Sequence, residues 1–162
     1  MCIRDSFIGL LLSRPADHSL LNQVAQLEAD ESPIGEAIQV LARLARVTTP
    51  EAAEREFNTL FIGIGRGELL PFASYYLTGF LNEKPLAKLR ADMAERGIQR
   101  APDKHEPEDN IASLAEMMGG LILGRFGTVA PLEDQKAFFD AHIAPWAIHC
   151  FTDLEGLSLI HI

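Results

Sequence analysis

The sequence predicts an all-α protein that folds as a single helical bundle. Apolar residues recur at intervals of three and four along most of the chain, which is the period of one helix face. No stretch alternates apolar and polar residues between hairpin turns, and the segments do not repeat at a fixed period. The chain has 162 residues, 48% of them hydrophobic. This is enough to form one hydrophobic core but too short a chain for two domains of usual size. We therefore expect one domain.

The two ends of the chain differ from the rest. Residues 1–6 (MCIRDS) and 157–162 (LSLIHI) can be encoded by DNA stretches that are reverse complements of each other, as in a sequencing adapter. We interpret both as translated adapter. The helical domain is then expected to span residues 7–156 and to be truncated at both ends.

Three helices are expected in the first half, after the end of an earlier helix at residues 7–12. Asp17, Ser32 and Thr49 each precede an apolar periodic segment, and their side chains can accept a hydrogen bond from the first helical turn. Pro follows two of them, in the position that suits the start of a helix. The expected inner faces are Leu20, Leu21, Val24 and Leu27; Ile34, Ile38, Leu41, Ala42 and Ala45; and Ala53, Phe57, Leu60 and Phe61.

The stretch at residues 68–81 (ELLPFASYYLTGFL) is too apolar for an ordinary surface loop, and helical segments flank it. Pro71 suits the start of a helix. We expect a buried helix here, with one of its two adjacent tyrosines in the core and the other in a groove. The aromatic residues that recur with the spacing of one helix face are Phe72, Tyr75, Tyr76 and Phe80.

Three further helices are expected in the second half. Gly97 suits a left-handed stop of the first, and Pro145 predicts a break near Ala144 in the last. Their expected first residues are Pro85, Pro107 and Pro131. Their expected buried faces are Leu86, Leu89 and Met93; Ile111, Leu114, Ala115, Met118, Leu121 and Ile122; and Phe138, Phe139, Ile143, Trp146 and Cys150.

The chain is acidic, which indicates the kind of partner that it can bind. It has 14 Lys and Arg against 23 Asp and Glu, a formal net charge of −9. Nucleic-acid backbones require basic patches, so a basic peptide is the more natural partner. Apart from the adapter residue Cys2, Cys150 is the only cysteine, which excludes a disulfide framework and suits the cytoplasm. No apolar run approaches the roughly 20 residues of a membrane span, so no stable membrane insertion is expected.

No motif indicates catalysis, a metal or a cofactor. Gly63, Gly65 and Gly67 follow no strand and lack the Lys of a phosphate loop, so flexible backbone is the favoured interpretation. His105 has acidic neighbours but no second histidine at metal-binding spacing, which favours an acidic helix start. His142 lies beside no Ser or Cys nucleophile in the sequence.

One helix face is small and acidic. The expected helix at Pro107 is apolar on one side, and the opposite side is small and carboxylate-rich. Such a face suits a solvated surface, or close approach of a peptide whose arginines meet the acids, and spacing alone leaves both open. The residues of this face are Asp109, Ala112, Ser113, Glu116 and Gly120.

Four segments carry a resemblance to a known family: FNTLFIG at 57–63, ELLPFASYYLTGFL at 68–81 with PLAKLRADM after it, EPEDN at 106–110, and 138–155 from FFDAHIAPW to DLE. In these segments the chain resembles the TorD/DmsD family of redox-enzyme maturation chaperones. The most specific signal is a Pro-x-Ala-Ser segment followed some thirty residues later by Glu-Pro-x-Asp. The resemblance covers nearly all of residues 7–156.

The resemblance implies a helical cytoplasmic chaperone without enzymatic activity. Its partner would be the twin-arginine signal peptide, and the precursor, of a molybdenum-cofactor oxidoreductase, which it assists before export. At one position the chain departs from the pattern, because Asn110 stands where most members have histidine. The residues that the resemblance places in the signal-peptide groove are Leu70, Pro71, Ala73, Ser74, Tyr75, Glu106, Pro107, Asp109 and Asn110.

Two other functions remain open from the residues alone. A general helical adaptor would bind folded partners instead of leader peptides. A small helical hydrolase would use His105 with neighbouring carboxylates, although no recognisable ligand set accompanies it.

Overall fold

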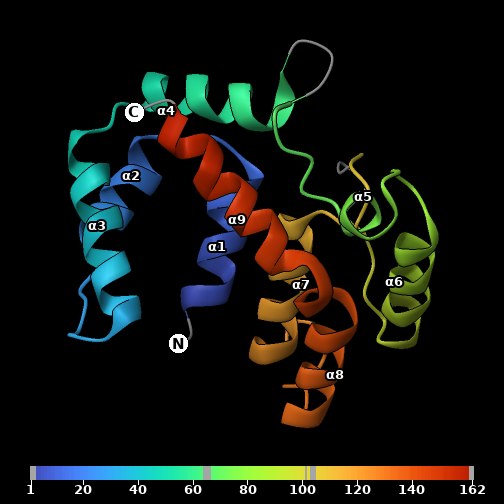
Figure 1. The fold of residues 1–162 in the computed structure, drawn as a ribbon. Coiled ribbons are helices and arrows are strands. Elements are labelled where there is room, and N and C mark those ends of the chain that lie inside the picture. Colours follow the sequence, from blue (N-terminus) through green and yellow to red (C-terminus); the bar gives the residue numbers. More distant parts are fainter. Residues whose placement is uncertain (1–2, 64–66, 101, 103–104, 161–162) are drawn as a thin grey trace. The chain divides into compact units, whose positions relative to one another are not determined.

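The computed structural model describes residues 3–63, 67–100, 102 and 105–160, and the elements of this part of the chain are helices joined by connections (Figure 1). Its sole β-type pairing is an isolated antiparallel bridge between Phe72 and Asn110. The all-α prediction is therefore confirmed. The described chain divides into two compact units, residues 14–67 and residues 1–13 with 68–162.

The unit at residues 14–67 contains α2 (His18–Ala25), α3 (Pro33–Val47), α4 (Pro50–Phe57) and the π-helical turn η1 (Asn58–Ile62). Asp17, Ser32 and Thr49 cap the three α-helices as expected, each accepting a hydrogen bond from the backbone three residues on. Helix α2 packs against α3. Local capping chemistry thus determines where these helices begin.

Two expected faces in this unit are only partly correct. Of the residues expected to be buried along α4 and η1, Leu60 is buried, but Ala53, Phe57 and Phe61 are half-buried. Helix α3 buries Gly35, Ala42 and Ala45, but Ile34 is 59% exposed. A Cβ at position 35 would clash with the backbone of Asp30. The absence of a side chain at Gly35 therefore lets the start of α3 pack closely against this segment. Residues 64–66 of the predicted glycine junction lie outside the described residues.

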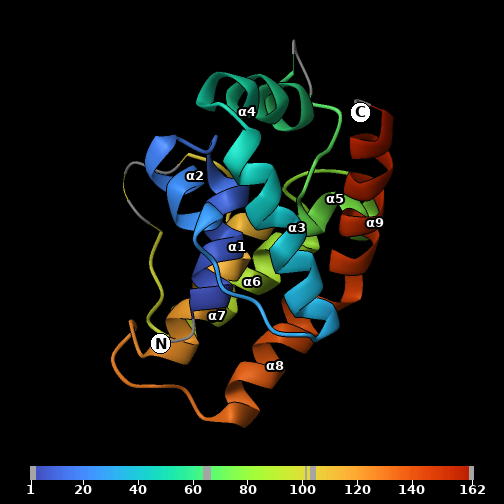
Figure 2. The ribbon, with the colours of Figure 1, turned by 90° about the vertical axis from the view of Figure 1, so that its left-hand side faces the viewer.

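The other unit contains α1 (Ile3–Ser13), α5 (Ala73–Thr78), α6 (Lys84–Glu95), α7 (Ile111–Leu123), α8 (Leu132–His142) and α9 (Ala144–Ile160). Helix α1 lies along α7, α5 contacts α6 and α9, and α8 contacts both α7 and α9 (Figure 2). The predicted break is confirmed: α8 ends at His142 and α9 begins at Ala144, immediately before Pro145.

The core of this unit lies between these helices. Leu114, Phe138 and Trp146 have no exposed surface, and Leu89 and Cys150 are 1% exposed. Burial of a large apolar side chain stabilises a fold by about 2 kcal/mol, so these positions hold α6 to α9 together. Trp146 also donates its indole N–H to the carbonyl of His142 at 2.7 Å, which satisfies its polar atom.

The aromatic helix is shorter than predicted. Pro71 and Phe72 are extended, α5 begins at Ala73, and Gly79 ends it in the left-handed conformation with φ 83°. Phe80 is therefore outside the helix and 70% exposed, so it does not share the predicted buried face. Tyr75 and Tyr76 are both half-buried, so the expected division into a core and a groove tyrosine is not seen.

The start of α7 also differs from the prediction. The helix begins at Ile111, with Asn110 as its cap, and not at Pro107. Glu106 and Asp109 consequently lie in the connection before the helix and are not neighbours on its first turn. None of the described helices is long and apolar enough to cross a membrane.

Candidate functional site

The two motif segments that lie far apart in the sequence meet in the structure. The amide of Ala73 donates to the carbonyl of Asp109 at 3.0 Å, and the amide of Ile111 donates to the carbonyl of Pro71 at 2.9 Å. These two bonds form the Phe72 and Asn110 bridge. The backbone before α5 is thereby tied to the backbone before α7.

Side chains strengthen this connection. The Asp109 carboxylate accepts from the amide of Ser74 at 2.8 Å and from its hydroxyl at 2.5 Å, both through Oδ2. Phe72, the residue before α5, has no side chain able to cap the helix. Asp109 therefore caps α5 from 35 residues away, and its negative charge suits a helix N-terminus.

The second carboxylate oxygen of Asp109 is different. Oδ1 is buried and has no hydrogen-bond partner among the described residues, and Asp109 as a whole is only 1% exposed. A buried acceptor without a partner costs about 1 to 3 kcal/mol. This oxygen is thus a buried acceptor left unpaired within the described part of the chain.

Asn110 has a local role. Its Oδ1 accepts from the amide of Ala112 at 2.9 Å, which caps α7. Asn is among the preferred residues for this task. Asn110, at a position where the resemblance leads to the expectation of histidine, therefore caps the helix here.

Glu108 forms a partly buried ionic connection. It receives two hydrogen bonds from Arg90 of α6, at 3.0 and 2.8 Å, and Arg100 lies 3.7 Å away. Burial alone would raise the pKa of Glu108, but the Arg90 and Arg100 guanidinium groups outweigh it and lower the pKa below its usual value. The carboxylate is therefore held in its charged form and ties the connection before α7 to α6.

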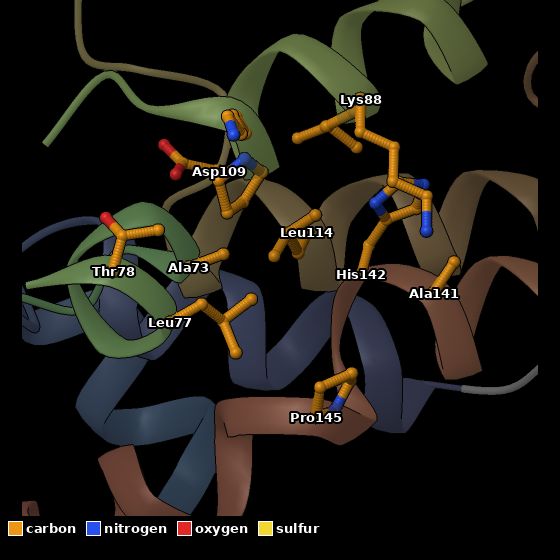
Figure 3. Close-up of a pocket in the computed structure, with 12 residues that line it drawn as sticks. Ala73, Leu77, Thr78, Lys88, Asp109, Leu114, Ala141, His142 and Pro145 are labelled. Carbon is orange, nitrogen blue, oxygen red and sulfur yellow. The ribbon is translucent and has the colours of Figure 1, made fainter.

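A pocket of 460 Å³, which we call pocket A, opens beside α5 (Figure 3). This volume is in the range of sites that bind small ligands or side chains. Its walls come from α5, α6, α7, α8 and α9, and most of them are apolar. The lining residues are Ala73, Leu77, Thr78, Lys84, Pro85, Lys88, Leu89, Asp109, Leu114, Ala141, His142 and Pro145.

A second pocket of 310 Å³, pocket B, contains much of the small acidic face of α7. Glu108 lines pocket B and the next residue, Asp109, lines pocket A, so the connection before α7 separates the two. More of the side chains that line pocket B are polar or charged than of those that line pocket A. Its lining residues are Ser13, Ile98, Gln99, Arg100, Glu106, Glu108, Ala112, Ser113, Glu116, Met117, Arg125 and Phe126.

His142 forms part of the wall of pocket A, and contacts with α6 hold its side chain in place. Its Nε2 lies 2.9 Å from Asp92 of α6, and Arg96 donates to the same carboxylate at 2.8 Å. Burial raises the pKa of Asp92, but the hydrogen bonds from His142 and Arg96 outweigh it and lower the pKa. This network connects α8 to α6 and holds the pocket wall.

Tyr76 of α5 packs against α9. Tyr76 stacks on Trp146 with ring centroids 5.4 Å apart, and its hydroxyl donates to Asp153 at 2.8 Å. Burial and this hydrogen bond raise the pKa of Tyr76. Burial also raises the pKa of the neighbouring Cys150 thiol to about 11, so this thiol is protonated and unsuited to nucleophilic chemistry.

The predicted groove residues fall into three sets. Pro71, Ala73, Ser74, Asp109 and Asn110 come together at the bridge, as described above. Leu70 and Tyr75 are half-buried beside them, whereas Glu106 is exposed and lines pocket B, next to half-buried Pro107. Asp109 and Glu106 therefore face different pockets.

Sequence reasoning missed most of pocket A. Its unpredicted walls include Lys88, Leu114, His142 and Pro145. Leu114 and Leu89 were expected only as core residues, and the positions come from five separate helices. No spacing within the sequence indicates that they meet.

Metal binding has no support in the described part of the chain, where no three His, Cys, Asp or Glu residues cluster as ligands. His105 is exposed, and Glu108 is occupied by arginines. The described residues of the two pockets therefore offer apolar walls in pocket A and exposed carboxylates in pocket B.

Comparison with known proteins places the chain in a family. The family model described as nitrate reductase delta subunit matches residues 27–152. The chaperone protein TorD of Vibrio vulnificus (strain CMCP6) is 28% identical over 137 residues, covering 79% of this chain and 64% of the relative. TorD of V. vulnificus (strain YJ016) is 30% identical over 108 residues, 65% of this chain and 50% of the relative.

A third relative, TorD of Aliivibrio fischeri (strain ATCC 700601 / ES114), is 34% identical over 70 residues, which are 42% of this chain and 33% of the relative. The chain thus spans at most about two-thirds of the length of these relatives. No solved structure matches it significantly. With most of its length matched by the family model, the chain belongs to the nitrate reductase delta subunit family, the TorD-like family that its motifs resemble.

Proposed function

We propose that this protein is a cytoplasmic chaperone that binds the twin-arginine signal peptide of a molybdenum-cofactor oxidoreductase and assists its maturation before export. It acts by reversible binding and not by catalysis. The relatives named above are chaperones, which supports this function class.

The observation that carries the proposal is the arrangement around the connection before α7. Pocket A offers an apolar cavity on one side, and exposed Glu106 and Glu116 line pocket B on the other. A leader peptide presents the matching chemistry, because it combines an apolar stretch with two adjacent guanidinium groups. Apolar side chains would enter pocket A, and arginines would meet the carboxylates of pocket B.

Asp109 takes a revised role in this proposal. Its Oδ2 is occupied by Ser74, so it positions α5 and the wall of pocket A. Its unpartnered Oδ1 is the acceptor that a donor on the leader would satisfy. Glu106, which is exposed, is the better placed of the two acids for a first contact with arginine.

Calorimetric titration of a synthetic twin-arginine leader peptide tests the proposal. We expect binding that weakens with added salt and falls by about tenfold or more when both arginines are replaced by lysine, because lysine cannot make bidentate contacts. Glu106→Lys should weaken binding, whereas Glu133→Lys, the same charge change on exposed α8, should not. Absence of binding to either peptide would contradict the proposal and favour a general adaptor.

A further inference from the structure

Two lysines stand at pocket A in an otherwise acidic protein. Lys84 and Lys88 both line this pocket, and both are exposed on the first turns of α6. The chain has a net charge of −9, so two positively charged side chains beside one apolar cavity contrast with the negative charge of the protein as a whole.

Neither lysine has an ion-pair partner among the residues that the structure describes. Asp109, which also lines pocket A, accepts two hydrogen bonds from Ser74 through Oδ2, and Asp92 accepts from His142 and Arg96. The lining of pocket A thus contains two lysines and one carboxylate, and neither lysine forms an ion pair with that carboxylate.

The two lysines do not stabilise each other on α6. They are four residues apart and repel each other as like charges on one helix face. They also lie near the positive end of the helix dipole, where acidic residues are favoured, and the first turn of α6 contains no acidic residue. An anion between the two lysines would relieve both effects.

The rest of pocket A is suited to an apolar group. Leu89 and Leu114 are buried at 1% and 0% exposure, while Leu77 is 46% exposed and remains accessible. Phe80 and Leu81, which follow α5, are also exposed at 70% and 40%. A ligand therefore meets apolar walls and, beside them, two ammonium groups.

We propose that pocket A binds a peptide segment in which an apolar side chain is followed by a carboxylate, with the apolar group against Leu77, Leu89 and Leu114 and the carboxylate between Lys84 and Lys88. This inference goes beyond leader binding, because paired arginines would be repelled by these lysines. It assigns a second recognition chemistry, for an acidic apolar segment of a client polypeptide.

Titration of the isotope-labelled protein with short blocked peptides, followed by NMR chemical shifts at low salt, tests this inference. The probes are one Gly/Ser-flanked peptide with a Leu-Glu pair and matched peptides with Leu-Gln, Leu-Lys and Ala-Glu. We expect shifts at Leu77, Leu89 and Leu114, with the Leu-Glu peptide bound about fivefold more tightly than the Leu-Gln peptide. The Leu-Lys and Ala-Glu peptides should bind more weakly still.

Matched variants test whether the two lysines cause the difference in affinity between the peptides. The double variant Lys84→Gln and Lys88→Gln should bind the Leu-Glu and Leu-Gln peptides equally. Lys136→Gln combined with Arg43→Gln, which removes the same charge from exposed positions outside pocket A, should keep the difference. Equal affinities of wild-type protein for the two peptides, or no shift with any of them, would overturn the inference. Either result leaves the twin-arginine titration as a separate test of the proposed function.

Discussion

Asp109 and Ser74 are joined by two hydrogen bonds across 35 residues of sequence, and both are buried, at 1% and 0% exposure. This pair unites the Pro-x-Ala-Ser and Glu-Pro-x-Asp motifs in one structural unit. It explains why the two motifs occur together, since one supplies the start of α5 and the other supplies its cap.

Replacement of Asp109 by alanine should lower the free energy of unfolding by about 2 to 3 kcal/mol, because two buried donors of Ser74 lose their acceptor. Ser74→Ala should cost about 1 kcal/mol, and the double variant should cost less than the sum of the two. Urea denaturation measures these values. Asp134→Ala, an exposed acid in the first turn of α8, is the control and should change stability by less than about 0.5 kcal/mol. An Asp109→Ala effect as small as the control would show that the pair does not hold α5.

Asn110→Ala should lower the free energy of unfolding by about 1 kcal/mol, because α7 loses its cap. Asn110→Asp should retain most of the stability, since Asp also accepts from the amide of Ala112. Thermal denaturation of the two variants side by side distinguishes them. A loss that is equal in both would mean that the cap is not the function of this side chain.

Acid should weaken the fold through Glu108. Its pKa is lower in the folded state than the ordinary value of 4.5, so its contribution is complete above that pH and is lost as pH falls through the folded value. Urea midpoints measured between pH 3 and pH 6 should fall toward acid, with a smaller slope in Glu108→Gln. Asp92 contributes with the same sign and remains in both proteins. Identical slopes would exclude Glu108 as a source of the acid sensitivity.

Cys150 should resist alkylation in the native protein. Burial raises its pKa to about 11, so roughly one thiol in a thousand is ionised at pH 8. Cys2 is replaced by serine in this experiment so that only one thiol reacts. Iodoacetamide modification, followed by mass spectrometry, should be at least about a hundredfold slower than in urea. Equal rates would mean that the packing of α9 against Tyr76 opens readily.

The starts of α2, α3 and α4 could be predicted because each depends on a cap within three residues of the helix. Asp17, Ser32 and Thr49 act through neighbouring backbone amides, so the sequence contains all the information required. The break before Pro145 was predictable for the same reason.

The length of α5 and the start of α7 could not be predicted in this way. Periodicity predicted that α5 continues to Phe80, and Pro107 predicted that α7 starts there. Both predictions were wrong. The bridge between Phe72 and Asn110 holds these segments extended, and it depends on a contact between distant parts of the chain. Pocket A was missed for a similar reason, because its lining comes from five helices.

The central claim is that a twin-arginine leader binds with its apolar side chains in pocket A and its arginines at the neighbouring acids of pocket B. The most direct test is to add the unlabelled leader peptide to the isotope-labelled protein and map the chemical-shift changes. We predict the largest changes at Leu77, Thr78 and Leu114 of pocket A and at Glu106 and Glu116 of pocket B, with little change at exposed Glu133. Changes confined to residues 14–67, or no change at saturating peptide, would contradict the account.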